Sequence, residues 1–200
     1  MKIKLKEYQY YLANKYSEYS KIFMIFEITL LLLFFILFPF VRKDILIFSF
    51  YTIIYFYIIT FKIKSIEYLG LSTIISLIWV YVMKDFYIYT PDMTTLFGLN
   101  IYTLLAWSLG LFALRELYDY FKPKKILSSI LIITILYWII LITLETVSYH
   151  ILGFKVMNNY PGIPICDCIH GPKILQTYYI SIGPIYYVLT LLLDKFIKKR

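Results

Sequence analysis

The chain has 200 residues, of which 61% are hydrophobic and 16% are charged. An ordinary soluble domain is about 45–50% apolar and about 25% charged, and a small domain cannot hide such an excess of apolar surface from water. The same composition excludes a disordered chain, which would be poor in aromatic and branched residues. The net charge of +8 does not indicate nucleic-acid binding, because the cations flank apolar segments and form no continuous basic face. The composition therefore predicts an integral membrane protein.

Six apolar stretches have the length that a membrane-spanning helix needs, roughly 17–25 residues. They cover residues 22–41, 45–61, 66–83, 95–114, 126–143 and 174–193. A β-barrel would need strictly alternating apolar and polar positions, which these runs lack. We therefore predict an all-α fold, with residues 1–200 forming a single membrane domain of six helices. The charged, tyrosine-rich segment 1–21 is expected to be retained rather than cleaved as a signal peptide.

Lysine and arginine residues are distributed unequally between the two sides of this predicted bundle. Fifteen fall in the N-terminal segment, the second and fourth connections and the C-terminal tail, whereas five fall in the other connections. Cytoplasmic loops of membrane proteins carry the excess of cations. We expect a multi-pass protein of the cell membrane with both termini in the cytoplasm and with the loop 145–173 outside.

Two of the cytoplasmic segments mix cations with aromatic residues. The segment 1–21 carries tyrosines on one helical face, and the segment 115–125 combines four cations with two tyrosines and a phenylalanine. This mixture is typical of the lipid headgroup region. The lipid bilayer is thus the expected partner, with anionic lipids at the cytoplasmic face, no nucleic acid, and an oligomeric state that the pattern leaves open.

All cysteines and histidines of the chain lie in the predicted external loop. They are His150, Cys166, Cys168 and His170. In an extended segment, alternate side chains share a face, so Cys166, Cys168 and His170 would project together. Two sulfurs and an imidazole are ligands of zinc or copper. A single Cys-x-Cys without a second pair departs from the usual zinc spacing, so a thiol function, an intermolecular disulfide and an ordered loop without chemistry stay open.

Glu145 and His150 are the candidate catalytic residues. Glu145 lies at the outer end of the fifth predicted helix, and continuation of that helix would bring His150 about one turn further. A carboxyl group and an imidazole can act as a general acid–base pair if their geometry allows it. At the membrane interface, Glu145 can equally meet water or pair with a lysine.

The leading hypothesis is a small membrane enzyme or metal-handling protein with an outward-facing site on the loop 145–173. The first alternative is a transport or binding subunit with a site in the bundle interior, near Asn100 and the Gly183–Pro184 step, which is expected to kink the sixth helix. The second is a structural subunit that docks through a stripe of small residues. That stripe comprises Asn100, Thr103, Ala106, Gly110 and Ala113.

Overall fold

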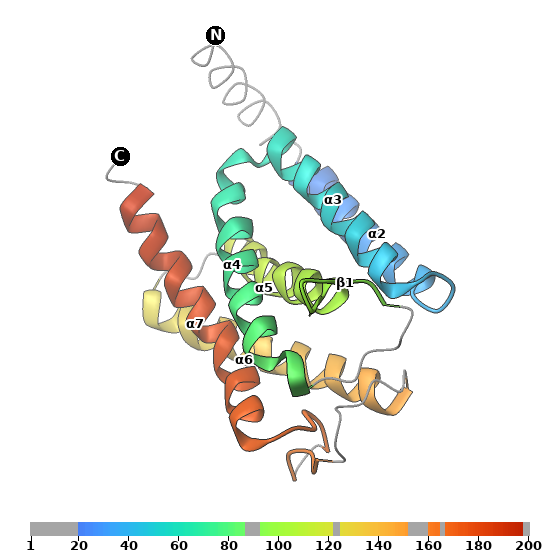
Figure 1. Cartoon of the computed structure of the whole chain (residues 1–200). Coiled ribbons are helices and arrows are strands. Elements are labelled where there is room, and N and C mark those ends of the chain that lie inside the picture. Colours follow the sequence, from blue (N-terminus) through green and yellow to red (C-terminus); the bar gives the residue numbers. More distant parts are fainter. Residues whose placement is uncertain (1–19, 87–92, 122–124, 152–159, 165–166, 198–200) are drawn as a thin grey trace.

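The computed structural model describes residues 20–86, 93–121, 125–151, 160–164 and 167–197, and this part of the chain is mostly helical (Figure 1). Its long helices are α2 (Ser20–Leu37), α3 (Lys43–Phe61), α4 (Ile66–Met83), α5 (Ile101–Phe121), α6 (Ile126–Thr146) and α7 (Lys173–Ile197). Its short elements are η1 (Ile63–Ser65), η2 (Lys84–Phe86), the π-helix η3 (Val147–Ile151), β1 (Thr95–Leu96) and β2 (Leu99–Asn100). The helical fold class is confirmed, whereas residues 1–19 of the predicted interfacial segment lie outside the described residues.

Three helical stretches are long and apolar enough to cross a membrane. They are Lys43–Phe61, Ile63–Phe86 and Ile126–Thr146. Their outward faces carry large apolar side chains; on α6, Leu127, Leu131 and Ile139 are 80%, 61% and 58% exposed. Such a continuous apolar surface is not tolerated in water but matches lipid hydrocarbon. The chain is a helical membrane protein.

Helix α5 is the central helix of the fold. It packs against α3, α4, α6 and α7, and its residues contribute to each of the three buried apolar clusters. Because one side of α5 packs against other helices, it can carry there polar side chains that a lipid-facing surface could not. Ser108 and Arg115 are examples, 0% and 5% exposed.

The helix predicted over 95–114 begins at Ile101 instead, so the prediction for its first six residues is wrong. Strands β1 and β2 form an antiparallel hairpin around Phe97 and Gly98, whose φ angles are 51° and 75°. Two central residues with positive φ make the tight turn that joins paired strands. Asn100 then caps α5, because its side-chain oxygen accepts a hydrogen bond from the Thr103 backbone N–H at 3.0 Å. Asn100 is therefore a helix cap rather than part of a helix–helix stripe.

The predicted small-residue stripe is buried at one end and exposed at the other. Asn100 and Thr103 are buried. Gly110 and Ala113 are exposed, and a Cβ atom added at Gly110 would meet nothing within 4 Å in the described part of the chain. The second half of the stripe thus faces away from the described helices.

Helix α7 runs without interruption through Gly183 and Pro184. Proline has no N–H to donate, which leaves the carbonyl group four residues earlier without its helical partner. Helix α6 supplies the replacement: the Trp138 indole N–H donates to the Ile180 carbonyl oxygen at 2.9 Å. Tyr137 donates its hydroxyl hydrogen to the neighbouring Tyr179 carbonyl. These two bonds satisfy the backbone at the proline, as a membrane helix requires.

Candidate active site at the start of α7

The end of α6 and the segment before α7 meet at one end of the molecule, at the bottom of the view in Figure 1. Helix α6 passes into the π-helix η3, which carries Tyr149 and His150. Short π-helical turns are rare and occur frequently at functional sites, because the extra residue re-aims the side chains that follow. Two aromatic side chains are thereby directed toward the segment 160–172.

The segment before α7 is folded into a tight turn. The Ile163 backbone N–H donates to the Cys168 carbonyl at 2.8 Å, and the Asp167 N–H donates to the Ile163 carbonyl at 2.9 Å. Asp167 and Ile169 have φ angles of 41° and 55°. A β-branched residue in this left-handed region is a true outlier, costing about 1–3 kcal/mol, and such strain concentrates at functional sites.

This turn corrects the extended conformation that the sequence suggested for residues 166–170. In an extended chain Asp167 would point away from His170, but the left-handed residues reverse the chain direction and bring the two side chains together. His170 Nε2 lies 3.0 Å from Asp167 Oδ1. The extended conformation is therefore wrong for Asp167 and His170, whereas Cys166 lies outside the described residues.

Two imidazoles converge on the carboxylate of Asp167, forming what we call the His–Asp cluster (His150, Asp167 and His170). His150 Nε2 lies 3.0 Å from the Asp167 carbonyl oxygen and 3.6 Å from carboxylate Oδ2. The exposed fractions of the side chains are 43% for His150, 69% for Asp167 and 7% for His170. One imidazole is therefore reachable from outside, whereas the other is held inside the fold.

His170 is packed closely by two residues. Its ring stacks on Tyr149, with ring centroids 3.5 Å apart and an angle of 7° between the planes. Gly162 lies close to its Nε2 atom, and a Cβ added at Gly162 would be 2.9 Å from His170 Nε2 and from Asp167 Oδ1. Only glycine permits this close approach. The Nδ1 atom of His170 is buried and has no hydrogen-bond partner in the described part of the chain.

Gln176, in the first turns of α7, fixes the turn to the helix. Its side-chain nitrogen donates to the Pro161 carbonyl at 3.1 Å and to the Ile169 carbonyl at 3.2 Å. The sequence analysis did not single out this residue. A long amide side chain just after a loop rich in proline and glycine is the signal that could have found it, because such loops leave carbonyl groups without partners.

The predicted metal ligands are only partly described. Cys168 is fully buried among apolar side chains, and Cys166 lies outside the described residues. Among the residues that the structure does describe, no group of three or more His, Cys, Asp and Glu side chains is arranged to hold a metal ion. Because Cys166 is one of the three predicted ligands, the zinc or copper site stays a prediction.

Glu145 and His150, the predicted acid–base pair, are not joined. His150 pairs with Asp167 instead, since the π-helical turn rotates it toward the segment 160–172. Glu145 is half-buried and lies near enough to Tyr102 and Tyr137 for its charge to act on their hydroxyl groups. The carboxylate partner of His150 is therefore Asp167 rather than Glu145.

A second polar region, which the sequence analysis missed, lies toward the other end of α7. Arg115 is almost fully buried and pairs with Asp194 at 3.0 Å and with Asp119 at 3.3 Å. It also donates to the Tyr68 hydroxyl at 3.3 Å. We call these four residues the Arg115 network. From the start of α7 to Asp194, the helix rises by about 30 Å, so the network and the His–Asp cluster are far apart.

A neighbouring group of charges joins three helices. Lys62 donates to Glu27 on α2 at 2.5 Å and also to Glu116 on α5. Glu27 on α2 therefore faces the end of α3. Burial lowers the pKa of Lys62, but the carboxylates of Glu116 and Glu27 raise it by more, so the net shift is upward. Lys62 and Arg115 are thus both paired with carboxylates of the protein.

Apolar helices with an outward hydrocarbon-like surface place this chain among helical membrane proteins. No protein-family model, no curated protein and no solved structure matches the chain.

Proposed function

We propose that this chain is a small multi-pass membrane enzyme whose active site is the His–Asp cluster, with His170 as the group that accepts a proton from the substrate. The observation that carries the proposal is the pairing of a buried imidazole with a carboxylate, while its second nitrogen has no partner. The topology that belongs to it is a six-helix bundle in the cell membrane, with both termini in the cytoplasm and the cluster outside. The unequal distribution of cations supports this orientation.

The chemistry follows from the two nitrogens of the His170 ring. When the neutral ring carries its proton on Nε2, that N–H donates to Asp167 Oδ1, and Nδ1 keeps a free lone pair. A carboxylate bonded to one nitrogen fixes the tautomer and stabilises the imidazolium formed when the other nitrogen takes a proton. Nδ1 of His170 would take the proton, and the carboxylate of Asp167 would hold the ring through its Nε2–H.

His150 supplies the complementary role. Its ring is partly exposed and lies on the other oxygen of the same carboxylate. An exposed imidazole in this position can exchange protons with water and return one to the product. The π-helix, the strained turn and Gly162 together maintain this geometry, which explains why the protein keeps a costly local conformation there.

The activity test incubates the protein in lipid nanodiscs with a total lipid extract and follows the lipid species by mass spectrometry. We expect the wild-type protein to change the abundance of some lipid species. The rate of this change should be at least about 100-fold lower with His170→Gln, since general-base catalysis contributes roughly 10²–10⁴-fold. Asp167→Asn keeps the ring in place and should show a similar loss. Lys173→Gln, an exposed neighbour, is the matched control.

Two results would contradict the proposal. One is a wild-type chain that leaves every lipid species unchanged, and the other is an Asp167→Asn variant as active as the wild type. Because Asp167 is largely exposed, its replacement by asparagine should not prevent folding.

The topology is tested with an impermeant maleimide on intact cells, using a Cys166→Ala, Cys168→Ala chain that carries Lys173→Cys or Lys195→Cys. Labelling of the first and not of the second is expected, and the reverse would overturn the orientation.

A further inference from the structure

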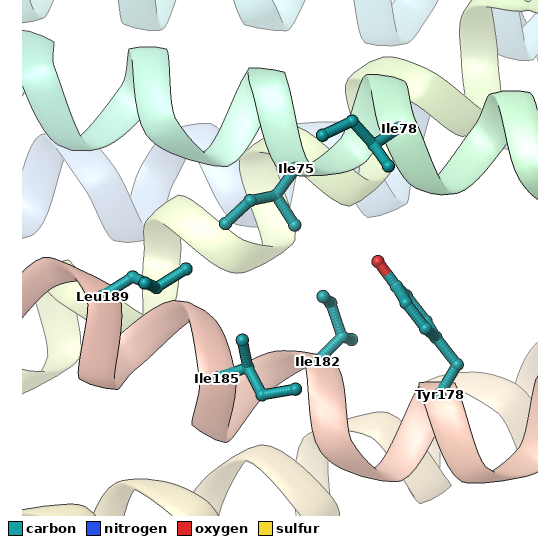
Figure 2. A pocket seen from close by; sticks show the side chains of 6 residues that line it. All are labelled: Ile75, Ile78, Tyr178, Ile182, Ile185 and Leu189. Carbon is teal, nitrogen blue, oxygen red and sulfur yellow. The ribbon is translucent and has the colours of Figure 1, made fainter.

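A groove lies between α4 and α7 on the outer surface of the helices. It has a volume of about 200 Å³, and Figure 2 shows its lining. The lining residues are Ile75, Ile78, Tyr178, Ile182, Ile185 and Leu189. A second hollow of about 270 Å³ shares Ile185 and Leu189 with the first and extends to Pro184 and Val188. The two hollows therefore lie next to each other along α7, within the twelve residues from Tyr178 to Leu189, which rise by about 16 Å.

The position of the groove decides what kind of molecule can fill it. Helix α4 belongs to a stretch that can cross a membrane, and Ile78 and Ile185 on the two walls are 58% and 48% exposed. In a bilayer this face meets hydrocarbon chains rather than water. Its occupant is accordingly the apolar chain of a lipid.

One end of the groove is not apolar. Tyr178 stacks flat on Trp79, with centroids 3.6 Å apart and 5° between the planes, so the direction of its hydroxyl is fixed. Figure 2 shows this hydroxyl pointing from α7 into the space beside α4. No hydrogen bond from it is formed within the described residues. An unpaired hydroxyl in hydrocarbon costs free energy that a polar atom of a bound molecule would recover.

Tyr178 is the polar residue among those that line the two hollows. The indole nitrogen of Trp79 and the hydroxyl oxygen of Ser76 on α4 also have no partner among the described residues, but both atoms are enclosed and line neither hollow. The polar contact that the groove offers to a bound molecule is therefore the Tyr178 hydroxyl.

We propose that the groove binds the substrate of the His–Asp cluster, and that this substrate is a lipid with a long hydrocarbon chain and an oxygen-bearing group near Tyr178. The inference rests on the proposed function, because it names the substrate class for that site. Tyr178 lies five residues into α7, about 8 Å along the helix from its first residue, and His170 precedes that residue by three positions. The chain would lie along α7, and its polar end would face the cluster.

The test uses two photoreactive probes of equal length in nanodiscs, a C16 alcohol and the corresponding C16 hydrocarbon, each with a diazirine on the chain. Crosslinked peptides are identified by mass spectrometry. We expect about 5- to 30-fold more labelling of the α4 and α7 peptides by the alcohol, since a hydrogen bond in the membrane contributes about 1–2 kcal/mol. Tyr178→Phe should reduce labelling by the alcohol to the level of the hydrocarbon, whereas Tyr81→Phe on the exposed face of α4 should not.

A second pair of variants tests the groove itself. Ile185→Trp fills the groove and should reduce labelling by the alcohol to the level of the hydrocarbon, whereas Ile139→Trp, at a lipid-facing position of α6, should leave it unchanged. Equal labelling by alcohol and hydrocarbon in the wild type would mean that only bulk lipid enters, and it would overturn the inference. So would undiminished labelling of Ile185→Trp.

The outcome also separates this inference from the proposed function. His170→Gln should lose activity but keep the labelling of the groove. If its activity were unchanged while the groove bound the alcohol, the proposed active site would be wrong and the binding site would stand as a lipid site. If Ile185→Trp lost labelling but retained full activity, the groove would not be the substrate site, and the His–Asp cluster would be unaffected.

Discussion

Replacing Arg115 by methionine tests how much the Arg115 network contributes to the stability of the protein. The substitution keeps an unbranched apolar side chain but removes the ion pairs to Asp194 at 3.0 Å and Asp119 at 3.3 Å. It also removes the contact of the guanidinium carbon with the Tyr68 ring, 4.3 Å from its centroid. Removing one partner of a buried ion pair costs about 3–5 kcal/mol, because the remaining charge is left without compensation. Asp194 is 23% exposed, so we expect the lower end, about 3 kcal/mol.

The measurement is the free energy of unfolding in mixed micelles, determined by denaturant titration and followed by circular dichroism. A loss of about 3 kcal/mol corresponds to a more than 100-fold decrease in the folding equilibrium constant. Lys195→Met removes an exposed cation from the adjacent position of α7 and is the control. A double-mutant cycle with Asp194→Asn should show a coupling of at least about 1 kcal/mol. An Arg115→Met variant within about 0.5 kcal/mol of the control would refute the assignment of this pair as a structural contact.

Three further outcomes are expected. Gly183→Ala places a Cβ 2.5 Å from the Tyr137 ring and should destabilise the protein by about 1–3 kcal/mol. Gly110→Ala is the control, because its Cβ meets no atom within 4 Å, and it should leave the stability unchanged or raise it. Equal effects of the two variants in a thermal melt would contradict the packing of Gly183 against Tyr137. Asp44→Ala removes the carboxylate that accepts hydrogen bonds from the Thr94 backbone N–H at 2.9 Å and from the Thr94 hydroxyl at 2.6 Å. The hairpin before α5 should then open more often, which hydrogen exchange of its backbone amides measures as faster exchange. Unchanged exchange would show that Asp44 does not hold the hairpin. The pKa of Lys62 is raised above 10.5, so the stabilisation from its ion pairs is fully present below pH 10.5 and is lost only as the pH rises through the raised pKa. The difference in unfolding free energy between wild type and Lys62→Met should therefore be constant from pH 6 to 9. A fall of this difference within that range would argue against the ion pairs.

The positions of the helices could be predicted from hydrophobic length alone. The fourth element of the structure, α4, covers Ile66–Met83, the same range as its predicted stretch, and α6 extends only three residues beyond the predicted 126–143. This agreement has a simple cause: a bilayer fixes the length of an apolar helix, so the run of apolar residues itself marks the element.

The start of α5 shows what hydrophobicity alone does not reveal. Residues 95–99 are nearly as apolar as a membrane-spanning helix. They form a hairpin instead, because Gly98 permits the turn and Leu96 pairs with Leu99 across it. An asparagine directly before an apolar run is a helix-cap signal, and giving it weight would have placed the helix start after Asn100. The local rule was present in the sequence and competed with the apolar pattern.

The sequence marked the region of the candidate site but not the contacts within it. The clustering of histidines marked the region, yet the partner of His170 depends on left-handed φ angles at Asp167 and Ile169, neither of which is a glycine. Sequence patterns give no indication of such strained residues. In the same way, the pairing of Arg115 with Asp194 joins positions 79 residues apart in the chain, and only the packing of α5 against α7 brings them together.

The most direct test of the active-site assignment is the protonation of the His170 ring, measured by nitrogen-15 NMR on histidine-labelled protein in nanodiscs. For the neutral ring, the account predicts a proton on Nε2 and an unprotonated Nδ1, and it predicts that Asp167→Asn changes the His170 signals much more than Lys173→Gln does. A proton on Nδ1, or His170 signals that do not respond to Asp167→Asn, would contradict it.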